Sequence, residues 1–236
     1  KKNAIAICMA QSEELSELQS RIKNSLWGLF ISDALSMPVH WYYNRENIRT
    51  DFGKDGISKY EDAKHPHPEA FMIDTPYKPN LERATQLNRN VDIIPAEFRK
   101  FYDTNLPQTE KVEIDDASID KQHGNRVAAA KERYHYHHGL KAGGNTLGAH
   151  LSRLLLRNVV KQMQSNGVYM DRSFAADFVD YMTNKDNVRT DRDAYTEKFL
   201  RRYFEHYSNG KDILNCGHRQ QDDWSIGSHG GVIRPL

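Results

Sequence analysis

The chain has little of what marks secreted, membrane-spanning and nucleic-acid-binding proteins. Its two cysteines, Cys8 and Cys216, lie at opposite ends of 236 residues, which excludes a disulfide scaffold and favours a reducing compartment. The longest apolar stretch, residues 4–10, is far shorter than the roughly 20 residues of a membrane helix. Excess charge is also missing, because 33 Lys and Arg residues are balanced by 32 Asp and Glu residues. We therefore expect no membrane span and no nucleic-acid partner.

The two ends of the chain favour a piece of a larger domain. Residues 1–11 begin with two lysines and an apolar stretch, the order of a targeting sequence, yet no clear cleavage site follows. We expect a flexible tail here, and a cytoplasmic or other reducing compartment, with organelle targeting left open. The chain starts without Met and stops at "GGVIRPL". Residues 12–236 are therefore expected to form the N-terminal and central part of one domain that is truncated at its C-terminus.

Four stretches of the chain have helical periodicity, and no stretch alternates clearly enough to predict a strand. The first helix is expected to begin at a Ser12 cap and to end near Leu35, before Pro38. The second follows Asn145 and is apolar on nearly every side, which predicts a central, fully buried helix. It is expected to end in a left-handed cap at residues 166–167.

Two further helices are predicted in the C-terminal half. One begins after Asp171 and places Phe174 and Phe178 on the same stripe. The other is expected to run from Thr190 to residues 209–210, with Asp193 completing an approximate capping box. The four helices predict an all-α fold.

Helical periodicity fades between residues 60 and 131, a segment that holds six of the eight prolines. We expect a long ordered loop wrapped on the helical core rather than a second domain. Its apolar side chains suggest a partner-binding surface, and a lid over a small ligand is the alternative. These side chains are Phe71, Ile73, Tyr77, Ile93, Ile94, Phe98, Phe101 and Tyr102.

The stretch "SLWGLFISDALSMPVHWYY", residues 25–43, offers the first candidate site. Asp33 and His40 lie near the end of the predicted helix, beside the aromatic residues Trp41 and Tyr42. An acid and an imidazole in a partly dry cleft can perform acid–base chemistry, and aromatic rings can stack on a base or a sugar. The alternative is that Asp33 makes structural hydrogen bonds and the aromatic rings are core.

A second candidate site is "RYHYHHGLKAGGNT", residues 133–146. Its histidines lack a diagnostic zinc spacing, so a cluster that is solvated or packed in a loop is favoured over a metal site. Gly143 and Gly144 precede the second helix, whose first amides are a possible phosphate cradle. A third candidate, Asp222 and Asp223 before a Gly-rich turn, is a possible metal site or simply a solvated loop.

Three segments together carry a family resemblance. "WGLFISDALSMPVHWYYN", "YHYHHGLKAGGNTLGAHLSRLL" and "CGHRQQDDWSIGSHGGVIRPL" resemble successive motifs of the ADP-ribosylglycohydrolase superfamily, in particular its branch related to J-type lens crystallins. The resemblance implies an orthogonal bundle of helices, here with a long ordered loop insertion, that binds ADP-ribose. In active members, a dinuclear magnesium centre assists cleavage of the ribose C1 bond.

The chain departs from this family pattern at the metal-binding positions. The family's Thr-Asp-Asp-Thr segment falls on Gly143, Gly144, Asn145 and Thr146, and an acidic residue of active members falls on His40. An amide and a hydroxyl cannot replace two carboxylates around magnesium, so no metal site is expected. The resemblance also implies that the family's second metal motif lies beyond residue 236.

Two functions remain open from the sequence. The first is a noncatalytic structural or ligand-binding subunit without a cofactor, which takes an ADP-ribose-like ligand. The second is a hydrolase of altered chemistry that cleaves an ADP-ribosyl or related N- or O-glycosidic bond, with magnesium only in this case. The candidate catalytic residues are His40 and Asp33. The candidate ligand-binding residues are Trp41, Tyr42, Gly143, Gly144, Asn145 and Thr146.

Overall fold

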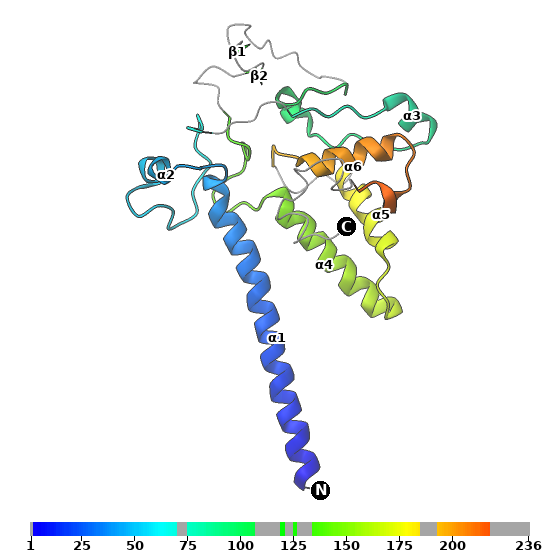
Figure 1. Cartoon of the computed structure of the whole chain (residues 1–236). Helices are drawn as coiled ribbons and strands as arrows, with labels where there is room; N and C mark the ends of the chain where they lie inside the picture. Colours follow the sequence, from blue (N-terminus) through cyan, green and yellow to red (C-terminus); the bar gives the residue numbers. More distant parts are fainter. Residues whose placement is uncertain are drawn as a thin grey trace.

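The computed structural model describes residues 2–69, 75–106, 119–120, 125–126, 134–184 and 193–217. Within them the architecture is all-α, as predicted (Figure 1). The α-helices are α1 (Lys2–Ser36), α2 (Arg45–Phe52), α3 (Leu81–Gln86), α4 (Leu147–Asn166), α5 (Asp171–Thr183) and α6 (Lys198–Ser208). Short 3-10 helices are η1 (Met37–Val39), η2 (Ala96–Phe101) and η5 (Ile213–Asn215). The only sheet in the described residues is an antiparallel pair, β1 (Ile119–Asp120) and β2 (Asn125–Arg126).

Helix α1 ends where the sequence predicts but begins earlier. It stops at Ser36, and Pro38 lies within η1 directly after it. The predicted cap at Ser12 is wrong, because the helix already includes residues 2–11. The flexibility expected for these residues stays a prediction. The helix extends away from the other elements toward the N-terminus (Figure 1), and its exposed side chains include Trp27, which is 61% exposed.

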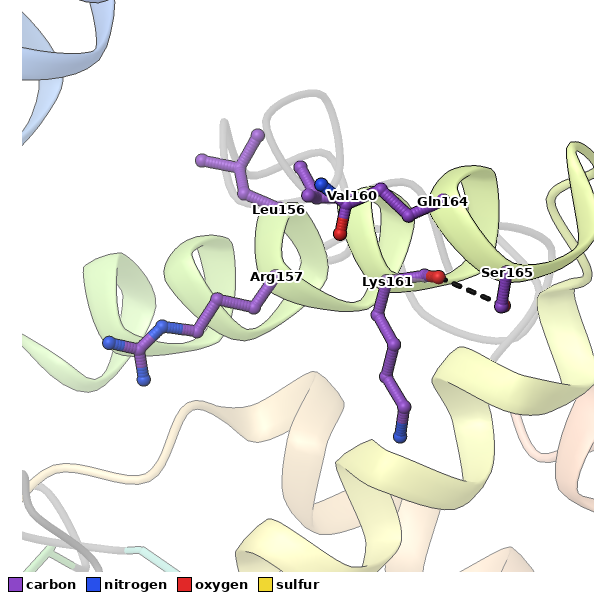
Figure 2. A pocket seen from close by; sticks show the side chains of 6 residues that line it. All are labelled: Leu156, Arg157, Val160, Lys161, Gln164 and Ser165. Atoms are coloured by element: carbon purple, nitrogen blue, oxygen red, sulfur yellow. Dashed lines mark hydrogen bonds between the residues drawn. The ribbon is translucent and has the colours of Figure 1, made fainter.

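Helices α4 and α5 form a hairpin, and α4 packs mainly on one side. The predicted C-terminal cap is confirmed, because Gly167 takes the left-handed conformation with φ 66°. The prediction of a helix covered on every side is wrong in the described part of the chain, where Val160 and Met163 are 53% and 51% exposed. Figure 2 shows this outer side, which an open pocket follows along Val160, Lys161 and Gln164. Apolar composition thus indicated a helix, but not which of its sides is covered.

Helix α6 packs into the core through several fully buried side chains. Leu200 and Phe204 are both 0% exposed, and the Phe204 ring contacts Phe178 of α5 at 5.6 Å between centroids. Helix α5 begins at Asp171, close to its predicted start, whereas α6 begins at Lys198 and not at Thr190. Thr190 lies outside the described residues, and Asp193 lies before α6 rather than inside it.

The segment between residues 60 and 131 is partly core. Within its described parts it contains α3 and η2, and Tyr77, Ile93, Ile94, Phe98 and Tyr102 are buried against α5 and α6 side chains. The partner-binding surface predicted from these five residues is therefore wrong for them, because their side chains face the interior. Phe71 and Ile73, which supported the same hypothesis, lie outside the described residues.

No helix among the described residues is both long enough and apolar enough to cross a membrane. This agrees with the short apolar stretches of the sequence.

Candidate functional site

Asp33, on the last turns of α1, joins α1 to the start of α4. Its Oδ2 accepts hydrogen bonds from Asn145 Nδ2 at 2.9 Å and from the Thr146 amide at 2.8 Å. Its Oδ1 accepts from the Thr146 hydroxyl at 2.7 Å, and Asn145 Nδ2 also donates to the Phe30 carbonyl. Three predicted site residues thus meet, although more than a hundred positions separate Asp33 from the other two. A carboxylate at a helix N-terminus is favoured by the helix dipole.

Asp193, in the segment before α6, holds the same end of α4. Its Oδ2 accepts from the Leu147 amide at 2.9 Å, and its Oδ1 accepts from the Tyr195 amide at 3.1 Å. The first two amides at this helix end, those of Thr146 and Leu147, are therefore occupied by carboxylates of the chain itself. A phosphate bound at this end would need donors other than these two amides.

The glycines before α4 form a tight turn. The Gly144 amide donates to the Lys141 carbonyl at 2.7 Å, and a Cβ on Gly144 would lie 2.9 Å from that same oxygen. Gly143 has φ 81° and packs near the ring of Tyr60. This turn excludes a larger residue at position 144, which includes the aspartate of the family motif that this segment resembles.

His40, His137 and Asp193 form a continuous chain of polar contacts. His40 Nδ1 is hydrogen-bonded to His137 Nε2, and His137 Nδ1 lies 2.9 Å from Asp193 Oδ1. His137 is 3% exposed and Asp193 is 1% exposed, whereas His40 remains exposed. The contact chain therefore leads from the surface into the interior.

The electrostatics of the two rings are opposite. Burial lowers the pKa of His137, but the charge and hydrogen bond of Asp193, with smaller effects of Asp33 and Glu197, outweigh it and raise the pKa. Desolvation, the charge of His137 and the charge of His67 all lower the pKa of His40. A proton taken up by the pair is thus stabilised on His137.

Two more histidines lie against this pair but have other hydrogen-bond partners. His135 Nδ1 accepts from the His137 amide at 2.9 Å, and His67 Nδ1 accepts from the Glu69 amide at 3.1 Å. Each ring must then carry any neutral-state proton on Nε2. The Nε2 of a neutral ring in this form is a donor and cannot ligate a metal ion.

The aromatic candidates separate in the structure. Trp41 stacks near His40 and Tyr136, with centroid distances of 5.0 and 4.8 Å. Tyr42 turns elsewhere, and its hydroxyl donates to Asp51 Oδ2 at 2.6 Å. Only Trp41 therefore joins the histidine pair in an aromatic surface beside the start of α4.

The described residues do not fit a magnesium centre. They contain no group of three or more His, Cys, Asp or Glu side chains arranged to hold a metal ion. Asp33 and Asp193 are the nearby carboxylates, and both oxygens of each accept protein hydrogen bonds. Asp222 and Asp223 lie outside the described residues.

Sequence reasoning did not single out His137 or Asp193. His137 was one of several histidines with no spacing to distinguish it, and Asp193 was assigned to a helix cap. Their contact joins positions 56 residues apart. Only general chemistry could have suggested this contact: a charged aspartate that becomes buried requires a polar partner, and histidine is a suitable one.

The fold and site define an all-helical protein whose candidate site surrounds the N-terminus of one helix. The family model for ADP-ribosylglycohydrolase matches residues 14–235. The chain therefore belongs to the ADP-ribosylglycohydrolase family. No curated protein and no solved structure matches the chain.

Proposed function

We propose that this chain is a noncatalytic, crystallin-like member of its family that binds an ADP-ribose-like ligand or serves as a structural subunit without a dinuclear magnesium site. The observation that carries the proposal is the use of Asp33. Its carboxylate accepts hydrogen bonds from Asn145 and Thr146 and so ties α1 to α4. Asp33 is engaged in holding the start of α4 and does not replace the two carboxylates that positions 143–146 lack.

The ligand surface of this proposal surrounds the start of α4. Trp41 supplies an aromatic ring, and Asn145 and Thr146 supply polar groups that can orient a hydroxyl. The turn at Gly144 supports the loss of the metal site, because a side chain there would meet the Lys141 carbonyl at 2.9 Å. Gly143 and Tyr42 remain proposed ligand contacts.

Calorimetric titration with ADP-ribose tests this function. We expect binding with the same dissociation constant in magnesium and in a chelator, and weaker binding in Trp41→Ala. Tyr43→Ala is the matched control, because Tyr43 is a neighbouring aromatic residue that is 74% exposed. Binding that requires magnesium would contradict the proposal, as would equal affinity of the two variants for ADP-ribose.

A second candidate is a hydrolase that cleaves an ADP-ribosyl or related N- or O-glycosidic bond by altered chemistry. The contact chain from His40 through His137 to Asp193 favours it. An imidazole oriented by a second group is a common arrangement for acid–base catalysis.

A further inference from the structure

An exposed imidazole, a buried imidazole and a buried carboxylate follow one another beside the start of α4. His40 Nδ1 contacts His137 Nε2, and His137 Nδ1 contacts Asp193 Oδ1 at 2.9 Å. Of the three residues only His40 is exposed, and its Nε2 is the ring nitrogen that does not contact His137. This order differs from a random histidine cluster, since each group is placed to exchange a proton with the next.

Asp193 determines which nitrogen of His137 carries the proton. The carboxylate is held by the Leu147 and Tyr195 amides and can only accept from His137 Nδ1. Neutral His137 therefore presents an unprotonated Nε2 to His40, and His40 must donate from its Nδ1. Neutral His40 in this arrangement carries a lone pair on Nε2.

We propose that His40, His137 and Asp193 form an acid–base relay that works without a metal ion, with His40 facing a water molecule or a ligand hydroxyl. The O–H group gives its proton to His40 Nε2 and keeps the electron pair for attack. The Nδ1 proton of His40 passes to His137 Nε2, so the positive charge ends on His137 beside Asp193. His40 is the catalytic residue, and His137 and Asp193 are positioning residues.

This relay deepens the second candidate function, the hydrolase, which is the alternative to the noncatalytic subunit, and it rests on that candidate for the bond that is cleaved. The oxygen that loses its proton forms the new bond to ribose C1, and the bond from C1 to the acceptor breaks. His40 then returns its Nε2 proton to the acceptor atom, while His137 returns its proton to His40 Nδ1. The cycle consumes water and needs no oxidant or other reactant.

The surroundings of the pair favour a charge on the inner ring. Three carboxylates act on His137 and raise its pKa: Asp193, Asp33 on α1 and Glu197 at the start of α6. The ring of His135 lies near His137 and that of His67 lies near His135, and the aromatic rings of Trp41, Tyr136 and Tyr195 complete the surroundings. A shared proton is therefore drawn inward, which leaves His40 neutral.

The tautomer of His40 tests the relay in the unmodified protein. Nitrogen-15 NMR of the imidazole rings distinguishes a proton on Nδ1 from one on Nε2. At a pH above the pKa of the pair, we expect the His40 proton on Nδ1 and an unprotonated Nε2. A proton found on Nε2 of His40 at high pH would overturn the proposal.

Chemical modification provides the second test and does not depend on a substrate. Diethylpyrocarbonate reacts with unprotonated imidazole nitrogens, and peptide mass spectrometry follows its reaction at His40 alone. When His137 is protonated, its Nε2 proton faces His40 Nδ1, so neutral His40 then carries its own proton on Nε2 and is unreactive there. The reaction rate at His40 should therefore rise with pH as His137 loses its proton, with a midpoint above the ordinary histidine value of roughly 6.5, because the pKa of His137 is raised. In Asp193→Asn the midpoint should fall by about one to three pH units, because the charge that favours imidazolium is lost.

Asp177→Asn is the matched control for this experiment. Asp177 also accepts a side-chain hydrogen bond, from Asn158 at 2.7 Å, but it lies on α5 away from the histidines. If the relay is correct, the midpoint of the His40 modification rate in Asp177→Asn equals that of the wild type. Equal midpoints in Asp193→Asn and the wild type would overturn the relay, and the NMR measurement decides if Asp193→Asn does not fold. A confirmed relay without hydrolysis of ADP-ribosyl bonds would refute the hydrolase candidate alone.

Discussion

At the scale of single residues, two aspartates hold the start of α4. Asp33 and Asp193 approach the start of α4 from different segments and accept its first amides. The sequence identified Asp33, Asn145 and Thr146 as site residues, but not their mutual contact. A pattern of nearby residues contains no information on contacts across such a separation. Asp193 was missed for the same reason.

Replacement of Asp33 by Ala should lower the free energy of unfolding by about 1.5 to 3 kcal/mol, because hydrogen bonds to a charged group are lost and donors of α4 are left without their acceptor. Urea denaturation measures this change. Glu17→Ala, at an exposed acidic position on the same helix, is the control and should change stability by less than about 0.5 kcal/mol. Equal effects of the two substitutions would show that Asp33 does not cap α4.

Asn145→Asp should also destabilise the protein, since it places a second carboxylate where Asn145 Nδ2 now donates to Asp33 Oδ2 at 2.9 Å. Loss of this hydrogen bond and the like-charge contact predict about 1 to 3 kcal/mol. Thermal melts with and without magnesium measure the effect. Recovery of the melting temperature by magnesium alone would reveal a latent metal site and contradict the proposed loss of metal binding.

Burial makes His135 a source of acid sensitivity. Its pKa is lowered by burial first and then by the charges of His137, His67 and His40. The unfolded chain binds a proton at this residue below pH of roughly 6.5, while the folded chain does not, so stability is lost as pH falls. Between pH 7 and pH 5 this residue should account for about 2 kcal/mol. Urea melts of His135→Gln should show a smaller loss over this interval, and an unchanged loss would be inconsistent with a neutral buried ring.

At the scale of elements, the sequence located helices well but not their covered sides. The ends of α1, α4 and α6 were predicted because proline and glycine act locally. The start of α6 was predicted too early. Thr190 and Asp193 have the spacing of a capping box, but this local pattern does not show that Asp193 instead binds the Leu147 amide of α4. Burial of α4 was overestimated because leucine content does not specify which neighbours are present.

A matched pair of leucine substitutions tests the observed packing. Leu200→Ala in α6 should lower the free energy of unfolding by about 2 to 5 kcal/mol, because Leu200 is 0% exposed and its removal leaves a cavity. Leu154→Ala in α4 should cost less, because Leu154 is only partly buried. Denaturant melts of both variants give the comparison. A larger loss of stability for Leu154→Ala than for Leu200→Ala would support the fully buried α4 that the sequence predicted.

At the scale of the whole molecule, distant segments share one core. Tyr77, Ile93 and Phe98 come from the proline-rich stretch and pack with residues of α5 and α6. The sequence predicted this stretch to be ordered on the helical core, but it assigned the same side chains to an outer surface. A high content of aromatic and aliphatic residues indicates that a segment is ordered. It does not indicate whether the segment packs on the core of its own chain or on a partner protein. Contact with a partner through residues 60–131 stays a prediction.

The proposed loss of the magnesium site is tested most directly by an activity assay. The assay follows release of ADP-ribose from a mono-ADP-ribosylated peptide by the purified chain, in magnesium and in a chelator. An active family member that contains a magnesium centre serves as the positive control. We expect no magnesium-dependent release, because Asp33 is engaged at the start of α4 and positions 143–146 offer no carboxylate. Robust release that the chelator abolishes would contradict this expectation.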